Sequence, residues 1–445
     1  MLSWHRNWLR MLPLAGALCA GASPATDLVS VYRDAKTQDS AYAAAEAGWR
    51  ATREKLPQGL AQMLPSATLS ANTSINDREI LFRNGTNAIG RFNSNSVGVS
   101  VVQPILRLQN NAQYEQARAQ VEQADAQLAA AAQDLALRVA QLYFDVLLAQ
   151  DNLQLAGAQK EAFARQLEQA RRFFKVGIGA ITDAQEAQTR FDHAASQEIA
   201  AKNDLEIRKH ALQLIVTAAP PPLAGLGPGF VPERPSPDNM AAWVEQALAR
   251  NRLLSAQRSA LEIATHGVAK SRYEHFPTLD AIASYTRSGT GSGFEGGVGN
   301  DTTNKVLGLQ FSLPLFQGGG TVSRVRESLA TEDKARHDLE TTSRQVVLAT
   351  RQAFLEVDSG VAQVRAREQG VASARKQLDS TKLGREVGVR TGIDVLNSQQ
   401  LLTQAERDLA QARYAYILAW LRLKSSVGEL GEDDLARVNK WLSDK

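Results

Sequence analysis

The residue types that carry enzymatic or metal chemistry are scattered through the sequence and form no recognisable site. Six histidines lie far apart without the spacing of metal ligands, and the single cysteine, Cys19, lies close to the N-terminus. One glycine-rich segment, 291–296, fits the G-x-G-x-x-G pattern of nucleotide-binding loops. It lies between two expected strands and no helix follows it, so an external loop is the better interpretation. The sequence therefore predicts neither an enzyme nor a cofactor or metal site.

The remaining candidate side chains lie near two turns that are each centred on a glycine. Val176-Gly177 recurs as Val387-Gly388, 211 residues later along the chain. Glycine is the residue that most readily ends a helix in a left-handed conformation. Each pair therefore predicts a helix that ends in a tight turn.

Carboxylates follow both turns, at Asp183 and, with the same offset, at Asp394. Asp183 and Glu186 have the spacing of a helix-capping box, and Thr391 or Asp394 could cap the second returning helix. Capping and a functional role for these carboxylates both stay open from the residues alone.

These turns belong to an internal duplication that covers most of the chain. Leu64-Pro65 recurs as Phe276-Pro277, and Gln103-Pro104-Ile105 has its counterpart in Leu313-Pro314-Leu315. A repeat of this length is no solenoid unit and indicates two equivalent halves of one body. The connector between them holds seven of the 14 prolines and cannot continue a helix. The expected divisions are a signal peptide, a first repeat, a linker, a second repeat and a tail, at 1–22, 23–215, 216–239, 240–428 and 429–445.

Each half contains one helix of unusual length. Residues 107–174 lack proline, and apolar side chains recur every seven positions at Val121, Leu128, Leu135 and Leu142. This pattern predicts a coiled-coil seam, and the second half keeps it. A helix of about 68 residues spans roughly 100 Å at about 1.5 Å per residue. A compact domain does not need such a helix, whereas a structure that bridges a compartment does.

Two alternating segments precede the long helix in each half. Apolar and polar side chains alternate around Leu69–Ile75, and again around Leu307–Leu313. Runs of about 9–11 residues with one apolar face have the length and pattern of strands that cross an outer membrane. The expected strands are 66–76, 95–104, 277–287 and 305–315, and the expected Gly- and Asn-rich loops are 76–93 and 287–304.

Four strands cannot close a barrel that leaves a lumen, and lipid does not tolerate an open sheet edge. The chain is therefore expected to oligomerise. The periodicity favours neither two copies, whose eight strands make a filled barrel, nor three, whose twelve make a water-filled one, but a transport tunnel needs the larger number. The expected fold class is mainly α with a membrane β part. With three copies, long antiparallel coiled-coil helices would form a tunnel, and four strands per protomer would contribute to a twelve-stranded trimeric barrel.

The first 22 residues have the features of a secretory signal peptide. Basic residues open the segment, Met11–Ala20 is apolar, and Ala20-Gly21-Ala22 forms a small-x-small cleavage site. The apolar run is too short to span a bilayer. Lipid attachment at Cys19 is the alternative, but Leu18 occupies the position where a lipoprotein signal needs a small residue.

The charge pattern argues against nucleic acid as a partner. The formal net charge is +3, and 50 Lys and Arg are interleaved with 47 Asp and Glu instead of clustered. No later segment offers about 18 uninterrupted apolar residues, so no transmembrane helix is expected. An exported chain without such a helix is periplasmic, secreted or an outer-membrane barrel.

Three segments resemble the TolC family of outer-membrane export channels: Phe174–Ala184, Val387–Leu396 and Leu313–Gly320. The resemblance covers nearly the whole mature chain, including the duplication and the Pro-rich linker. It implies a passive exit duct in the outer membrane of a Gram-negative bacterium, used in type I protein secretion or multidrug efflux and opened at its periplasmic tip. The implied partners are two sister copies in a homotrimer, a periplasmic adaptor (membrane fusion protein), an inner-membrane transporter of the ABC or RND type, and outer-membrane lipid.

The same resemblance assigns roles to charged residues near the turns. Arg390 corresponds to a gate arginine that the tip of a neighbouring protomer holds, and Asp183 to a gate aspartate, so a contact between them is expected. Arg385 stands where the family has a gate tyrosine, a departure that adds positive charge. Asp394 corresponds to the first of two aspartates that ring the constriction, and Asn397 occupies the second position.

A ring with one carboxylate per protomer is expected to favour cations more weakly than a double ring. Mutual repulsion in that ring would raise the pKa of the Asp394 carboxyls. The resemblance also places the adaptor's hairpin in grooves at Gly177, Ile178, Gly388 and Val389.

The alternative from another functional class is a soluble periplasmic adaptor or scaffold built on long coiled coils. Such a protein would carry a compact module with globular hydrophobic patterning. The four expected strands are instead two-faced and of membrane length, which favours the channel.

Overall fold

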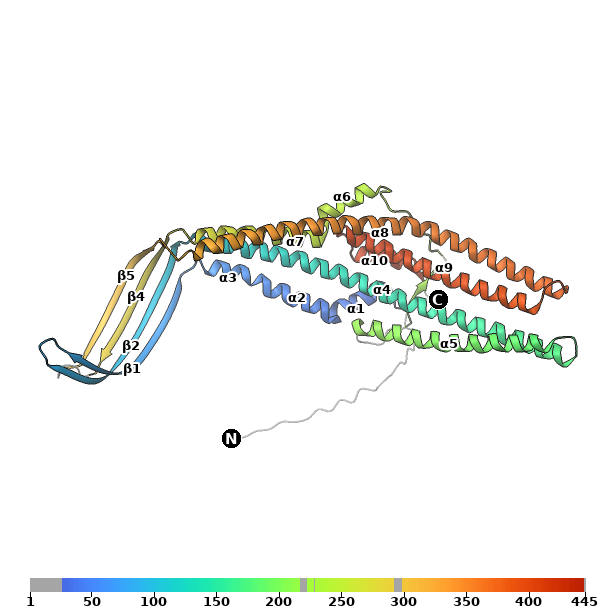
Figure 1. Cartoon of the computed structure of the whole chain (residues 1–445), viewed down its shortest axis with the longest axis horizontal. Coiled ribbons are helices and arrows are strands. Elements are labelled where there is room, and N and C mark those ends of the chain that lie inside the picture. Colours follow the sequence, from blue (N-terminus) through green and yellow to red (C-terminus); the bar gives the residue numbers. More distant parts are fainter. Residues whose placement is uncertain (1–25, 217–221, 228, 292–297, 444–445) are drawn as a thin grey trace, which may run out of the picture.

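The computed structural model describes residues 26–216, 222–227, 229–291 and 298–443, which form one elongated body with a sheet at one end (Figure 1). The expected signal peptide and part of the expected linker lie outside these residues. The first half contains α1 (Leu28–Gln38), α2 (Ser40–Arg53), α3 (Lys55–Ala61), β1 (Ser66–Leu81), β2 (Asn87–Leu106), α4 (Leu108–Lys175) and α5 (Ile181–Val216). The remainder contains β3 (Gly225–Leu226), α6 (Met240–Arg250), α7 (Arg252–Tyr273), β4 (Thr278–Thr290), β5 (Asn300–Ser312), α8 (Gly320–Glu386), α9 (Gly392–Ser426), α10 (Glu432–Asn439) and β6 (Leu442–Ser443).

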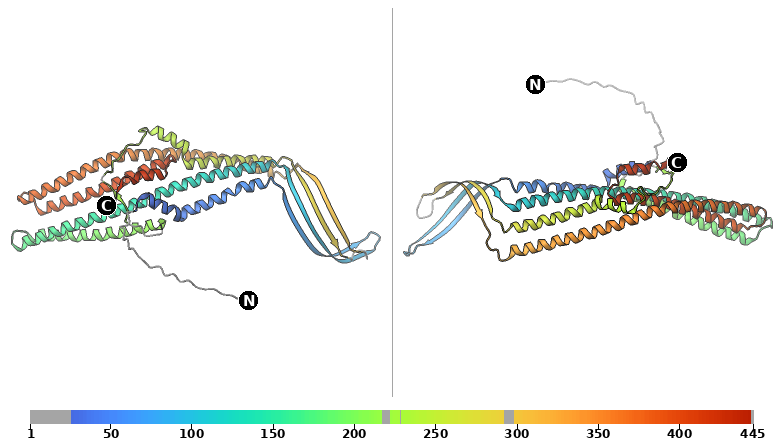
Figure 2. Two further views of the ribbon diagram at one scale, coloured as in Figure 1. Left: turned by 180° about the vertical axis from the view of Figure 1, so that it is seen from behind. Right: turned by 90° about the horizontal axis from the view of Figure 1, so that it is seen from above.

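Two helices, α4 and α8, run the length of the helical part (Figures 1 and 2). The long helix expected at 107–174 is confirmed as α4, with 68 residues, and α8 has 67. Toward the sheet α4 packs against α2, α3 and α7, and toward the far end it packs against α5 and α9. Leu135 of the predicted seam is fully buried, and Leu128 and Leu142 are half-buried. None of the helices in the described ranges is long and apolar enough to cross a membrane.

The four long strands form one antiparallel sheet in the order β1-β2-β4-β5. All four exist where the sequence predicts strands, but their outer ends differ from the expected bounds. β1 continues to Leu81 and β2 begins at Asn87, so the expected loop 76–93 shrinks to a turn at 82–86. β5 begins at Asn300 and ends at Ser312, before the expected 315. The glycine-rich segment 291–296 falls in the β4–β5 connection, mostly outside the described residues.

Polar cross-strand pairs explain the longer strands. Thr290 donates to Oδ1 of Asn300 at 2.6 Å, and Nδ2 of Asn76 donates to Oγ of Ser94 at 2.8 Å, at or beyond the expected strand ends. A residue in a sheet needs only partners on the neighbouring strand to stay paired. Segments rich in Asn and Ser, whose composition is typical of loops, can therefore continue a sheet.

The strand register gathers the apolar side chains on one face. Leu69 faces Val99, Val99 faces Tyr285, and Tyr285 faces Lys305 across the three ladders. Because side chains alternate along a strand, odd-numbered residues of all four strands share this face. Near the helices they are apolar except for Gln103, as a lipid-facing surface requires.

A small second sheet and α10 fold the chain end onto the middle of the helices. β6 pairs with β3 through Leu442 and Leu226. The ring of Trp441 lies 5.5 Å from that of Phe230 and 6.2 Å from that of Trp420, measured between centroids. The segment expected as a tail, 429–445, therefore contains packed structure that joins the connector to α9.

Candidate gate at the helix tips

Both long hairpins turn with the same backbone geometry at the end farthest from the sheet. Gly177 has φ of +77° and Gly388 has φ of +79°. The backbone N–H groups of Ile178 and Val389 each donate to the carbonyl five residues earlier, at 3.1 and 2.8 Å. These are Schellman motifs, in which a residue with positive φ lets the last carbonyls of a helix find donors. The helix ends predicted at both glycines are confirmed.

Three of the expected gate residues line one cavity of about 140 Å³ beside the turns: Asp183, Arg385 and Arg390. Burial lowers the pKa of Arg385, and the charge of Asp183 partly offsets this effect. Arg385 also donates from Nη1 to Oε1 of Gln169 at 3.1 Å, and its guanidinium lies 6.0 Å from the ring centroid of Phe173. Arg385 therefore shares this cavity with Asp183 and is influenced by its charge, although no ion pair within 4.0 Å joins the two among the described side chains.

Arg390 makes a different contact within the protomer. No ion pair within 4.0 Å joins it to Asp183 among the side chains that the structure describes. A Cβ at position 384 would lie 2.8 Å from Cγ of Arg390, so Gly384 makes room for the arginine stem. The side chain is exposed. The expected contact between Arg390 and Asp183 is therefore not an intramolecular one, and a contact between neighbouring protomers stays a prediction.

The second returning helix begins with a capping box. The backbone N–H of Thr391 donates to Oδ2 of Asp394 at 2.9 Å, and the N–H of Asp394 donates to Oγ1 of Thr391 at 3.2 Å. These hydrogen bonds lower the pKa of Asp394, and the charge of Arg390 adds to the effect. Capping is therefore confirmed for Thr391 and Asp394. The bonds oppose the rise in pKa that a ring of carboxylates would cause, so they favour the ionised form.

The first returning helix begins differently. Asp183 lies in the first turn of α5, which starts at Ile181, so it is not the N-cap of a box with Glu186. Glu186 instead forms an ion pair with Arg190, at 3.0 Å between Oε1 and Nη2. The capping box suggested by the spacing of Asp183 and Glu186 is wrong, because the helix starts before the aspartate.

Arg190, which the sequence analysis did not single out, holds Asn397. From α5 it donates to Oδ1 of Asn397 at 2.9 Å and to Oε1 of Gln400 at 3.1 Å, both on α9. The guanidinium therefore links the hairpin of the first repeat to that of the second. The spacing of Glu186 and Arg190 in the sequence indicates only an ion pair within one helix.

The turns themselves expose aliphatic side chains. Val176 and Ile178 are 67% and 73% exposed in the first turn, and Val387 and Val389 are 67% and 78% exposed in the second. Four such side chains at one end of the molecule form an apolar surface of the kind that marks a protein contact.

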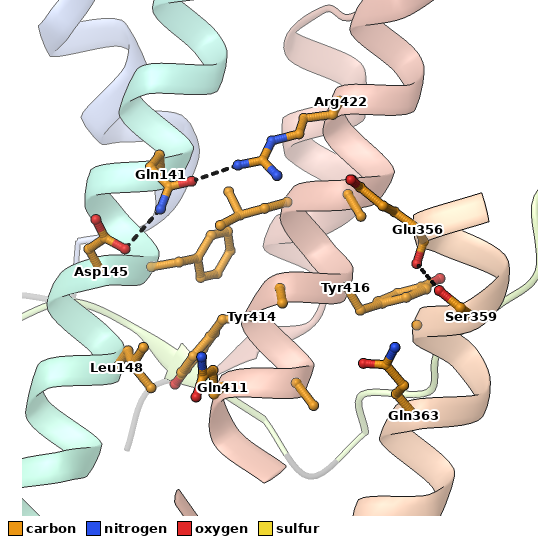
Figure 3. Close-up of a pocket in the computed structure, with 16 residues that line it drawn as sticks. Gln141, Asp145, Leu148, Glu356, Ser359, Gln363, Gln411, Tyr414, Tyr416 and Arg422 are labelled. Atoms are coloured by element: carbon orange, nitrogen blue, oxygen red, sulfur yellow. Dashed lines mark hydrogen bonds between the residues drawn. The ribbon is translucent and has the colours of Figure 1, made fainter. Parts of the chain in front are cut away.

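A cavity of about 400 Å³ lies between α4, α8 and α9 near the middle of the helices (Figure 3). Gln141 connects its walls, because it donates to Asp145 at 2.9 Å and accepts from Arg422 at 3.3 Å. Tyr414 donates to Asp151 at 2.7 Å, and burial together with that carboxylate raises the pKa of the phenol. None of the residues lining this cavity is a histidine or cysteine. Among the described residues, no group of three or more His, Cys, Asp or Glu side chains could hold a metal ion.

Most of the sequence matches a known family. A family model described as outer membrane efflux protein matches residues 31–217 and 243–429, one span in each half of the chain. The chain belongs to the outer membrane efflux protein family. This family consists of passive outer-membrane channels.

Relatives and solved structures agree with this assignment. The chain is 33% identical to the outer membrane protein TolC of Escherichia coli (strain K12) over 433 residues, 95% of this chain and 86% of TolC. It is 32% identical to the alkaline protease secretion protein AprF of Pseudomonas aeruginosa, over 93% of this chain and 87% of AprF. The outer membrane protein VceC of Vibrio cholerae has a similar structure, with a TM-score of 0.77 at 18% identity, over 90% of this chain and 96% of VceC. The CmeC outer membrane channel of Campylobacter jejuni gives a TM-score of 0.78 at 16% identity, over 100% of this chain and 98% of CmeC.

Family membership confirms the expected fold class, location and general function. The chain is an exit duct of the Gram-negative outer membrane, of the kind used in type I secretion and efflux, with a helical tunnel that extends into the periplasm. The four two-faced strands and the efflux family favour this function over that of a soluble coiled-coil adaptor.

Proposed function

We propose that three copies of the chain form a homotrimeric channel whose helix tips are a gate, opened by a periplasmic adaptor that connects it to an inner-membrane transporter. The observation that carries this proposal is the pair of open edges of the sheet. β1 and β5 are its outermost strands, and neither has a second partner strand among the described residues. Lipid does not tolerate unpaired edges, so β5 of one copy would pair with β1 of the next. Three copies give twelve strands, enough for a water-filled pore.

The helical part has two matching edges. On α5, Ile199, Ile207 and Leu214 are exposed at intervals of seven or eight residues, and on α8, Leu348 and Leu355 are exposed seven apart. These helices flank the protomer, because α4 packs against α9 between them. Apolar side chains with this spacing form coiled-coil seams, which supports packing of α5 in one copy against α8 in the next.

The charged residues near the turns supply the closing contacts of the proposed gate. Arg390 is exposed and has no ion pair with Asp183 in its own chain, so its guanidinium is free to reach the tip of a neighbour. Asp183 lines the same cavity as Arg385, whose positive charge attracts the carboxylate. Asp394 would contribute one carboxylate per protomer to the constriction, with Asn397 held by Arg190. Such a constriction favours cations only weakly.

The exposed turns are the proposed docking site of the adaptor. Gly177 and Gly388 leave the turns narrow, and Ile178 and Val389 present apolar side chains that a helical hairpin could cover. Adaptor binding would move the α8–α9 hairpin outward, and an inner-membrane transporter of the ABC or RND type would drive cargo into the tunnel. Two relatives are named for protease secretion, which supports a polypeptide cargo.

Single-channel recording in planar bilayers tests the gate. Arg390→Ser removes the proposed contact between protomers and should raise the conductance of the purified channel several-fold. Arg336→Ser is the matched control, because Arg336 pairs with Glu332 and Asp333 on the sheet-proximal part of α8. Equal conductance of the wild type and Arg390→Ser would contradict the gate, and a protein that forms no trimers by chemical cross-linking would contradict the assembly.

A further inference from the structure

The apolar face of the sheet ends in positive charge. Followed outward from the helices along this face, the first charged side chain is Arg91 on β2, Arg287 on β4 and Lys305 on β5, whereas β1 reaches Asp77 first. The helices extend into the periplasm, so the far ends of the strands lie toward the cell exterior. These cations therefore lie where the apolar band meets the outer leaflet.

Two of these cations are neighbours on the sheet. Lys305 faces Tyr285 across the β4–β5 ladder, and Arg287 faces Thr303. Arg287 and Lys305 are therefore diagonal neighbours on one face, about 7–8 Å apart at the backbone and within reach of a shared ligand. The Lys305 ammonium lies 5.9 Å from the ring centroid of Tyr285.

The neighbouring carboxylate leaves this pair largely available. Arg287 forms an ion pair with Asp301 at 3.5 Å, and the two side chains are 67% and 73% exposed. Exposed ion pairs of this kind contribute little free energy. Among the described side chains, none forms an ion pair with Lys305.

We propose that Arg287, Lys305 and Tyr285 form a docking surface for the phosphate group of a phosphorylated glycolipid of the outer leaflet, the lipid A part of lipopolysaccharide. A phosphate offers acceptors to both cations at once, and charge-assisted hydrogen bonds of this kind are the stronger ones. Tyr285 lies opposite Lys305 and two positions inward from Arg287, at the outer edge of the apolar band, the usual depth of an interfacial aromatic side chain. A cation is costly at the middle of the membrane but tolerated at its boundary. This inference rests on the barrel proposed above, because the sheet must be embedded in lipid.

Native mass spectrometry of the full-length trimer in detergent tests this surface. The probes are diphosphoryl lipid A, its dephosphorylated form and phosphatidylglycerol. Diphosphoryl lipid A should bind at least about tenfold more tightly than the dephosphorylated form, as expected for two charged hydrogen-bond donors on a phosphate. The double variant Arg287→Gln/Lys305→Gln should lose this preference, and Asp301→Asn should strengthen binding by removing the competing carboxylate. Arg83→Gln is the control, because this residue lies in the β1–β2 turn and not on the pair.

The outcomes separate this inference from the proposed channel. Equal binding of both lipid A forms, or wild-type preference in the double variant, would overturn the glycolipid site. Phosphatidylglycerol binding as tightly as diphosphoryl lipid A would overturn it as well, since the surface would then recognise any anionic lipid. Conductance of the double variant should match that of the wild type. If the wild type formed neither trimers nor channels, the proposed barrel itself would be refuted. The lipid-binding measurements alone could not give that result.

Discussion

The tip of the first repeat and the tip of the second turn through the same Schellman geometry, with φ of +77° at Gly177 and +79° at Gly388. Their side chains differ. The second tip carries Arg385 and Arg390, and its returning helix is capped by Thr391, whereas Ala180 occupies the position equivalent to Thr391 in the first tip. The duplication has therefore kept the backbone of the turn while the chemistry around it diverged.

The divergence makes each hairpin depend on the other. Arg385 of the second repeat donates to Gln169 of the first, and Arg190 of the first repeat donates to Asn397 and Gln400 of the second. Hydrogen bonds with a charged donor are stronger than neutral ones. Two reciprocal arginine links thus hold the hairpins together near the turns, and an outward movement of α8–α9 must break both.

Removing both arginine links should have the largest effect on the tips. We expect Arg190→Ala/Arg385→Ala to raise the fraction of open channels about tenfold or more, because each lost hydrogen bond to a charged group is worth about 1.5 kcal/mol or more. Planar-bilayer recordings of the double variant and of each single variant measure this effect. If α9 moved independently of α5 in the wild type, Arg190→Ala would leave the conductance unchanged, and the reciprocal-link interpretation would be wrong.

The shared backbone predicts equal sensitivity of the two turns to a β-branched residue. Gly177→Val and Gly388→Val should each cost about 1–2 kcal/mol of local stability, because both positions have positive φ. Hydrogen exchange of the backbone amides at 176–178 and 387–389 measures the local opening. Gly177→Asn and Gly388→Asn are matched controls that tolerate this conformation and should cost less. A strong effect at one turn alone would show that the turns are not equivalent.

The helices and turns could be predicted from the sequence because their signals are local. Proline-free heptads predict α4. Gly177 marks the end of α4, and Gly388 marks the end of α8. The outer strand ends could not, because the polar segments around Thr290 and Asn300 have the composition of loops and become strands only through cross-strand partners. The packing of Trp441 could not be predicted either, because its ring contacts that of Phe230, which is far away in the sequence.

The candidate site was predictable to a different degree. Residue positions in the tips followed from the duplication and the family resemblance, and Thr391 and Asp394 also fitted a local capping pattern that the structure confirms. Arg190 lacked any such pattern, because its partners on α9 lie more than 200 positions away. Contacts between the repeats follow from packing, which no periodicity in one helix specifies.

The capping box distinguishes the two tips and can be exchanged between them. Thr391→Ala should lower the protection of the first turn of α9 about fivefold, a typical effect for a lost N-cap. Ala180→Thr should raise protection at the start of α5, because it places a hydroxyl three residues before Asp183. No gain in the first tip would show that helix starts at the two tips differ in more than this side chain.

The same box should respond to acid. The pKa of Asp394 is lowered in the folded chain, so its contribution to stability is fully present above the ordinary carboxyl pKa of 3.8. That contribution is lost as the pH falls through the lowered value. Protection of the first turn of α9, corrected for the intrinsic pH dependence of exchange, should therefore fall in strong acid in the wild type. Asp394→Asn should remove this pH dependence, and its persistence there would assign it to another group.

The smallest expected effect concerns ion selectivity at Asn397. Asn397→Asp adds a carboxylate at the second constriction position, but Arg190 already donates to that side chain at 2.9 Å and would neutralise the new charge. We therefore expect only a slight shift of the reversal potential toward cations in a salt gradient. In the Arg190→Ala background the same substitution should shift it further, because the carboxylate is then unpaired. Asp394→Ala should shift it in the opposite direction in both backgrounds. If Asn397→Asp gave the full shift with Arg190 present, the hydrogen bond between Arg190 and residue 397 would be absent in the trimer. Arg190 would then not control the charge at the constriction.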